Sequence, residues 1–289
     1  GMELAGRRLA VLLLLAALVL GQALGHCSEG DWGCAQREFE EWAIAEGIEW
    51  HGIGIRTTVI DGLAQRGVFV ERDITDGELL LSIPFTAMMS RRTAEDGELG
   101  PWLLASSSAR DITATNEMAL HLLHELQQPR SRWGPYLRML PPAIPTTLFY
   151  SAEELEELQA SPLVEFTRLR KENAEAYYRD IVAPLTRAGA VGAELYDDEF
   201  SDDEEEEAVL GDATLEQWLW SLSVLWSRAF SVKIGGEDMG ALVPFADLFN
   251  AQPPGALAVR PHVRAELENG RLLYYAVRDI PADEEQRRA

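Results

Sequence analysis

The chain has 289 residues, of which 25 are lysine or arginine and 48 are aspartate or glutamate, so its formal net charge is −23. This length suits one large domain or two modest ones, and a hydrophobic fraction of 47% allows a sizeable core. Such acidity argues against binding of nucleic acid phosphates and favours contact with basic protein surfaces. Ten of the acids fall within residues 194–207, where like charges repel, so a solvated loop is predicted over 194–212.

Residues 1–25 have the pattern of a secretory signal peptide. Arg7-Arg8 precede an apolar run over 9–20, and small residues at 23–25 form a cleavage site before His26. The apolar run is shorter than the ~20 residues that a membrane-spanning helix needs. We therefore expect a protein of the secretory pathway with no stable membrane span after cleavage. An uncleaved anchor or an organelle-targeting peptide is the alternative.

Two cysteines, Cys27 and Cys34, follow the predicted cleavage site within a terminal segment over residues 26–37. In a secreted chain they predict one small disulfide loop. No second pair of cysteines is present to complete a zinc site, so no metal is predicted there. If the chain is not secreted, the two residues would be free surface thiols.

The first predicted elements are a helix and then consecutive strands. Residues 35–50 have the apolar spacing of a helix that ends at Gly47. Residues 53–84 change period, because short apolar and β-branched runs alternate with turn signals at Asp61-Gly62 and Asp76-Gly77. This pattern predicts strands joined by tight turns.

Residues 90–228 are predicted to be mostly helical. In one segment Met118 and Leu122 belong to an apolar stripe, and His121 and His124 flank it. Two histidines at this spacing can share a metal ion, but the favoured interpretation is a solvated flank of the helix.

After residue 228 the pattern returns to strands. Asn269-Gly270 lies between alternating apolar runs and predicts a hairpin. Strands on both sides of a long helical block predict an α+β domain whose sheet is split by a helical insertion over about residues 90–228.

Polar residues interrupt the apolar segment LVPFADLFNA. Asp247 and Asn250 would cost stability in a buried segment unless they had partners. Arg228 and the predicted tight turn at Arg66-Gly67 are further candidates for a shared site. Each also has an ordinary explanation: Gly67 can serve a turn, Arg228 can pair with any carboxylate, and Asn250 can cap the next turn.

Four segments, in this order, resemble SET-domain protein methyltransferases of the Rubisco large-subunit methyltransferase class, whose SET domain is split by a helical insertion. They are RGVFVERDITDGELLLSIP, SRWGPYLRMLPP, SRAFSV with LVPFADLFNA, and YYAVRDIPADEE. The resemblance covers about residues 38–285. It implies an α+β SET domain of short strands over residues 38–289.

The resemblance implies methyl transfer from S-adenosylmethionine to a side chain of a protein substrate, usually lysine. A lysine amine must be neutral to attack, so such a site lowers its pKa by desolvation and holds the sulfonium in line with it. Histidine methylation is known in the same class and is the alternative. Oligomeric state is not indicated.

Carried over by position, the resemblance implies roles for several polar residues. Arg228 would lie beside the cofactor or its aspartate neighbour, Asp247 would support the core, and Asn250 would contact the cofactor. The turn Gln65-Arg66-Gly67 would line the cofactor pocket through its backbone. Phe230 would form a wall of the substrate pocket.

The chain departs from the family pattern in three places. Ala251 stands where the family usually has histidine, and Asp283 where it usually has glycine before Glu284-Glu285. The family's catalytic tyrosine follows that turn, whereas Tyr274 and Tyr275 precede it, so no catalytic residue is assignable. These departures imply either an incomplete chain of an active enzyme or an inactive binding module of the secretory pathway. Without the closing segment we expect an unpaired sheet edge and an open pocket.

Overall fold

The structure is a computed structural model, and it describes residues 27, 31–60, 63–107, 112–159, 161–187, 208–234, 236–251, 262–282 and 285–288. The predicted signal peptide and most of the predicted acidic loop lie outside these residues. Among the residues that are described, no helix is both long enough and apolar enough to cross a membrane.

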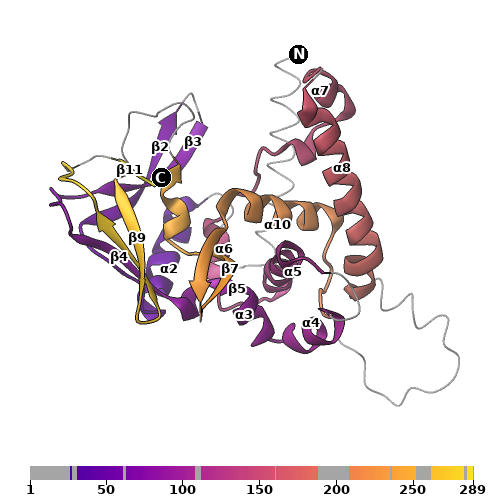
Figure 1. Ribbon diagram of the computed structural model, residues 1–289, viewed down its shortest axis with the longest axis horizontal. Helices are drawn as coiled ribbons and strands as arrows, with labels where there is room; N and C mark the ends of the chain where they lie inside the picture. The colour runs from indigo at the N-terminus through magenta and orange to yellow at the C-terminus, as the bar shows by residue number, and fades with distance from the viewer. Residues whose placement is uncertain are drawn as a thin grey trace, which may run out of the picture. The chain divides into compact units, whose positions relative to one another are not determined.

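The chain divides into two compact units. A helical unit comprises Gly1–Ala35 and Ala94–Ser227, and a sheet unit comprises Gln36–Thr93 and Arg228–Ala289. Figure 1 shows the strands in purple, orange and yellow, because the sheet unit combines segments far apart in sequence. The domain boundaries given above, at residue 38 and at about residues 90 and 228, remain predictions.

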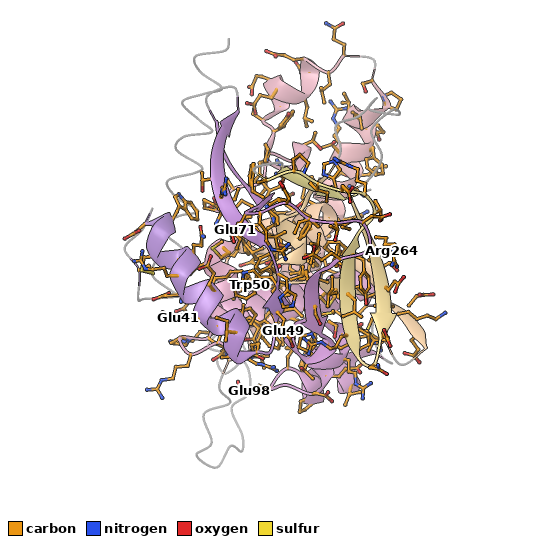
Figure 2. The ribbon with its side chains drawn as sticks, turned by 90° about the vertical axis from the view of Figure 1, so that its left-hand side faces the viewer. Glu41, Glu49, Trp50, Glu71, Glu98 and Arg264 are labelled. Carbon is orange, nitrogen blue, oxygen red and sulfur yellow. A yellow bond between two sulfur atoms is a disulfide. The ribbon has the colours of Figure 1, made fainter. Side chains whose placement is uncertain are left out.

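The strands of the sheet unit form three small sheets, ordered β1-β4-β10-β9, β2-β3-β11-β8 and β5-β7-β6. Their core consists of buried apolar side chains from both segments of the unit. Figure 2 labels residues of α2 and β1 in this unit. The bounds are β1 (Glu49–Trp50), β2 (Ile53–Ile60), β3 (Leu63–Val70), β4 (Leu79–Pro84), β5 (Met89–Ser90), β6 (Phe230–Ile234), β7 (Glu237–Leu242), β8 (Asn250–Ala251), β9 (Val263–Glu268), β10 (Arg271–Ala276) and β11 (Glu285–Arg288).

Helix α2 (Trp32–Ala45) is followed by Gly47, whose φ of +77° allows the chain to leave the helix. The predicted helix end at this glycine is confirmed. Two one-turn 3₁₀ helices, η1 (Phe85–Ala87) and η5 (Ala246–Leu248), and the short α3 (Arg91–Glu95) complete the elements that begin in the sheet unit.

Residues 65–67 belong to a strand, not to a turn. β2 and β3 pair along their whole lengths and end with Ile60 opposite Leu63, so the chain reverses between these two residues. The intervening Asp61-Gly62, where a turn was also predicted, lies outside the described residues. The prediction of a turn at Gln65-Arg66-Gly67 is therefore wrong, and Gly67 is an extended residue without a positive φ.

The hairpin predicted at Asn269-Gly270 is confirmed. Glu268 of β9 pairs with Arg271 of β10, so two residues form the loop. Their φ angles are +50° at Asn269 and +77° at Gly270. Both are left-handed, as the favoured two-residue hairpin turn requires.

Gly270→Ala should lower the free energy of unfolding by about 1–2 kcal/mol, because the Cβ atom of alanine clashes with the backbone in the left-handed conformation. A Cβ atom at Gly270 would meet nothing within 4 Å, so crowding adds no further cost. Gly240→Ala is the matched control, since its Cβ would also meet nothing within 4 Å and its φ is not positive. Urea unfolding measures both variants, and equal losses would contradict the argument from φ.

The strand β11 lies between β3 and β8. Glu285 pairs with Phe69 in an antiparallel ladder, and Arg287 pairs with Asn250 in a parallel one. Among the described residues β3 is therefore paired on both sides, whereas the unpaired sheet edge and the open pocket expected without a closing segment stay predictions. The four residues of β11 suffice to join the two strands because each ladder uses only two of them.

The described part of the helical unit is built from α-helices and several one-turn helices. Its capping box, in which Ser151 and Glu154 bond each other's backbone, fixes the start of α7. The elements are α4 (Gly100–Ser107), α5 (Ala114–Gln127), α6 (Gly134–Met139), η2 (Thr147–Phe149), α7 (Ala152–Glu156), α8 (Pro162–Tyr177), η3 (Tyr178–Val182), η4 (Ala183–Leu185) and α10 (Leu215–Arg228), whose last residue belongs to the sheet unit.

The histidines of α5 are buried, so their prediction as a solvated flank is wrong. His121 is 2% exposed and His124 is 4% exposed. The Nδ1 atom of His124 lies 2.7 Å from the carbonyl oxygen of Val209, and the His121 ring meets the Trp133 ring edge-on. Neighbouring segments cover α5 on more sides than its apolar stripe indicates. Within the described residues, neither histidine joins a group that could hold a metal ion.

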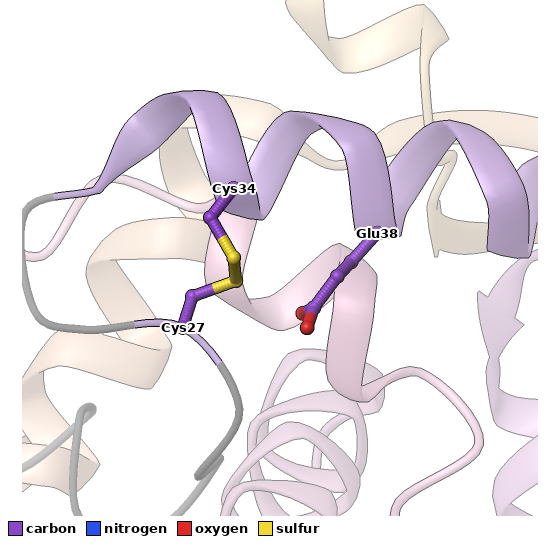
Figure 3. Close-up of side chains that lie close together, drawn as sticks. All are labelled: Cys27, Cys34 and Glu38. Carbon is purple, nitrogen blue, oxygen red and sulfur yellow. A yellow bond between two sulfur atoms is a disulfide. The ribbon is translucent and has the colours of Figure 1, made fainter.

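Cys27 and Cys34 form a disulfide that tethers residue 27 to the first turn of α2 (Figure 3). Glu38 follows Cys34 by one helical turn, and its carboxylate lies near the sulfur atoms. Two sulfurs bonded to each other have no thiolate to offer a metal, so this group is a covalent link in the chain.

Candidate functional site

Arg228 and Asp247 form a buried ion pair in the sheet unit. The Arg228 Nη1 atom donates to the Oδ2 atom of Asp247 at 3.1 Å and to the Asp247 carbonyl oxygen, also at 3.1 Å. The Asp247 side chain is 1% exposed and that of Arg228 is 23% exposed. Two bonds to one residue hold the guanidinium in place, and the charge of Arg228 offsets the cost of burying a carboxylate.

Asn250 connects β8 to β3. Its Nδ2 atom donates to the carbonyl oxygen of Arg66 at 3.3 Å. The two residues are 184 positions apart in the sequence, and the bond brings the LVPFADLFNA segment against β3. The backbone of Arg66 therefore lies next to the side chain of Asn250.

The side chain of Arg66 adds a second cation to this place. Burial and, to a smaller extent, the nearby positive charge of Arg228 lower the pKa of Arg66 to about 10, although the negative charge of Asp247 opposes both effects. Arg66 is therefore still charged at neutral pH. The two guanidinium groups both lie near the Asp247 carboxylate, whose negative charge offsets part of their mutual repulsion. We call Arg66, Arg228, Asp247 and Asn250 the arginine cluster.

A strained residue sets the position of η5, which carries Asp247. Phe245 has a φ of +71° and a ψ of −47°, a conformation that a residue with a Cβ atom adopts rarely and at a cost. Its ring is 1% exposed and packs against the rings of Phe39, at 6.1 Å between centroids, and Trp50, at 5.2 Å. This packing holds the unusual backbone that turns the chain into η5.

The structure thus brings together four of the predicted cofactor residues: Arg66, Arg228, Asp247 and Asn250. Gly67 follows Arg66 in β3, and the side chain of Gln65 lies outside the described residues. Phe230 begins β6, opposite Ala241, and is half-buried. Ala251 belongs to β8, where Arg288 of β11 pairs with it.

Sequence reasoning missed two parts of this site. It assigned Arg66 a role through its backbone, whereas its guanidinium also belongs to the arginine cluster. It also passed over Phe245, because a residue between proline and alanine carries no sequence signal for a positive φ. The one signal in the sequence was a large aromatic residue in an apolar segment, two positions before Asp247.

Comparison with known proteins identifies relatives of the chain. No family model matches the chain. It is 28% identical over 222 residues to an Arabidopsis thaliana [fructose-bisphosphate aldolase]-lysine N-methyltransferase, chloroplastic, covering 75% of this chain and 40% of that protein. It is 26% identical to the Nicotiana tabacum Rubisco large subunit N-methyltransferase, chloroplastic, covering 73% and 38%.

A third relative is the actin-histidine N-methyltransferase of Canis lupus familiaris, 25% identical over 85% of this chain and 38% of that protein. The chain thus spans about 40% of the length of the curated relatives it matches.

Solved structures decide the fold. The SET domain of LSMT, bound to lysine and AdoHcy, matches with a TM-score of 0.67 and 20% identity over 89% of this chain and 54% of that one. Rubisco LSMT bound to AdoMet matches with a TM-score of 0.65 and 22% identity over 88% and 52%. The chain has the SET-domain fold. The predicted α+β SET architecture is therefore confirmed, and the arginine cluster lies within the sheet unit of a SET fold.

Proposed function

We propose that this SET-fold chain acts in S-adenosylmethionine-dependent methyl transfer to a lysine side chain of a protein substrate. The observation that carries the proposal is the arginine cluster, a set of polar groups in the sheet unit with two arginines and a buried aspartate. Two of the relatives reported above are named as lysine or Rubisco large-subunit methyltransferases, which supports it. None of those relatives is named as an inactive module.

The residues of the cluster fit the amino-acid part of S-adenosylmethionine, which bears a carboxylate and an ammonium group. A carboxylate beside Arg66 and Arg228 would offset their mutual repulsion and the cost of burying Arg66. The carbonyl oxygen of Arg66 and the side chain of Asn250 are suited to an ammonium group. We therefore expect Arg66, Arg228 and Asn250 to hold this part of the cofactor, with Gln65 and Gly67 of β3 beside it.

The bound cofactor supplies a methyl group on a sulfonium. The chain supplies a binding site whose groups are fixed in advance: Asp247 holds the Arg228 guanidinium with two bonds, and Asn250 is held by the Arg66 carbonyl. Such fixed groups position reactants without a further loss of entropy. We expect the Phe230 ring to form a wall of the substrate pocket, where an aromatic face tolerates cationic groups and the exclusion of water keeps the lysine amine neutral.

A histidine substrate is the second candidate, because the actin-histidine methyltransferase covers the largest share of this chain among the relatives reported above. Imidazole is largely neutral at pH 7 without help from its surroundings, so this reaction would not depend on desolvation of the amine. Methylation of peptide arrays that contain lysine or histidine, with tritium-labelled S-adenosylmethionine, separates the two candidates.

Calorimetry of the full chain with S-adenosylmethionine tests the proposed site. Asn250→Ala should weaken binding about tenfold, because it removes a bond that positions β8 and a group that contacts the ammonium. Asn173→Ala, an exposed asparagine on α8, is the matched control and should leave the affinity unchanged. An unmodified chain that binds no S-adenosylmethionine, or an equal loss in the two variants, would contradict the assignment.

The compartment is a separate part of the proposal. The Cys27–Cys34 disulfide supports an oxidising compartment and hence the secretory signal. The plant relatives are named chloroplastic, which supports the alternative of organelle targeting. Amino-terminal sequencing of the protein from its natural source distinguishes the two, since cleavage by signal peptidase would leave His26 first.

A further inference from the structure

A cavity of about 610 Å³ opens within the helical unit, and none of its residues belongs to the arginine cluster. Its walls come from the start of α5, one face of α8, the turn η3 and the end of α10. The apolar lining includes Leu222, which is 3% exposed, and Tyr177, whose ring stacks on that of Trp218 at 5.1 Å between centroids. This part of the cavity suits an apolar or aromatic group.

Arg170 lies at this cavity as a fixed cation. Its guanidinium stacks on the ring of Phe166, at 4.3 Å from the centroid, and on that of Trp226, at 4.4 Å. No carboxylate of the described residues lies within 4.0 Å of it, whereas Arg168 and Arg179 each have one at that distance. This is notable in a chain with a net charge of −23. The N–H groups of the Arg170 guanidinium can therefore donate to an anionic group of a bound molecule.

The other polar groups of the cavity also suit an anion. Asn116 and Asn173 line it, and neither side-chain amide is hydrogen-bonded to another described residue, so both can donate. The acid in the lining is Asp180, whose carboxylate lies 3.9 Å from Arg179. Because the Asp180 side chain is 63% exposed, this acid stays in solvent, and Arg170 is the charged group that aromatic rings hold at the cavity.

An exposed apolar stripe continues from the cavity along α8. Leu163, Phe166, Arg170, Asn173 and Tyr177 follow one another at helical spacing and so share one face of the helix. Leu163 is 52% exposed and Phe166 is 50% exposed. A small molecule would occupy the cavity alone. A surface that extends beyond the cavity is better suited to a segment of polypeptide.

We propose that this groove of the helical unit docks a segment of a partner protein, in which an aromatic or branched aliphatic side chain enters the cavity and an adjacent aspartate or glutamate pairs with Arg170. The stacked guanidinium, which has no carboxylate partner among the described residues, selects an acidic segment over a basic one. The docking does not depend on methyl transfer, so loss of the proposed enzymatic function would leave it standing.

Fluorescence anisotropy with two labelled peptides tests the proposal on the full chain. The peptides have the same pattern of phenylalanine and leucine and differ only in carrying glutamate or lysine between them. The unmodified chain should bind the glutamate peptide more tightly than the lysine peptide. Arg170→Glu should weaken binding of the glutamate peptide at least about tenfold and improve binding of the lysine peptide. Arg168→Glu, the same change on the same helix outside the cavity lining, should alter either affinity less than about twofold.

A second variant addresses the apolar part of the groove. Trp226→Leu removes one of the two rings on which Arg170 stacks, so it should weaken binding of the glutamate peptide. The variant should still bind the glutamate peptide more tightly than the lysine peptide. No binding of the glutamate peptide by the unmodified chain would overturn the proposal. So would equal effects of Arg170→Glu and Arg168→Glu, or a preference of the unmodified chain for the lysine peptide.

Discussion

Asp247→Asn should lower the free energy of unfolding by about 3–5 kcal/mol, the loss typical of removing one partner from a buried ion pair. The Asp247 side chain is 1% exposed, and its carboxylate accepts from Arg228 at 3.1 Å. Asparagine keeps the shape but not the charge, so Arg228 and Arg66 would face each other without the carboxylate that offsets their repulsion. Urea unfolding followed by circular dichroism measures the change.

Asp212→Asn is the matched control for this substitution. Its side chain is 76% exposed and lies 3.7 Å from Arg187, so the same chemical change is made in a solvated ion pair. Exposed ion pairs contribute little to the free energy of unfolding, so Asp212→Asn should leave that free energy nearly unchanged. A similar result for the two variants would show that the charge of Asp247 does not stabilise the arginine cluster. Addition of S-adenosylmethionine should raise the melting temperature of the unmodified chain more than that of Asp247→Asn.

Phe245→Ala should cost about 3–5 kcal/mol of unfolding free energy, as is usual when a large buried ring is removed. The Phe245 ring is 1% exposed and packs on Phe39 and Trp50. The loss of these contacts also frees the left-handed backbone that leads into η5, so Asp247 should lose its fixed position. We therefore expect this variant to lose cofactor binding together with stability, as measured by chemical unfolding and calorimetry.

Glycine at the same position separates backbone strain from packing. At Phe245, where φ is +71°, Phe245→Gly should be more stable than Phe245→Ala by about 1 kcal/mol, because glycine adopts a positive φ without cost. At Phe39, which is fully buried within α2, the order should reverse, because glycine is less favourable than alanine in a helix by about 1 kcal/mol. The same order at both positions would show that the Phe245 backbone carries no strain.

Much of the secondary structure could be predicted because its causes are local. A positive φ after a helix or in a two-residue hairpin calls for glycine or asparagine, and Gly47 and Asn269-Gly270 carry that signal. A capping box involves residues only three apart, so Ser151 and Glu154 reveal the start of α7. The order of the four SET-like segments likewise required no knowledge of how they pack.

The errors arose where distant segments decide the outcome. The turn expected at Gln65-Arg66-Gly67 became part of β3, because the register with β2 pairs all three residues with residues of that strand. His121 and His124 were expected in solvent, but the periodicity of α5 shows only its most apolar side and not how many other segments cover it. The pairing of β3 with β11 could not be predicted from either segment alone, because the two strands are more than 200 residues apart.

The sequence by itself determined which residue types could form the candidate site, because aspartate, asparagine and arginine in apolar surroundings need partners. It also determined the SET-like order of segments that the solved structures then matched. The tertiary structure alone decided which of these residues meet. Asn250 reaches Arg66 across 184 positions of sequence, and Arg170 stacks between rings of two different helices. The physical reason is that helix and strand periods fix only the face on which a side chain lies, whereas charge, burial and strain depend on what the fold places against that face.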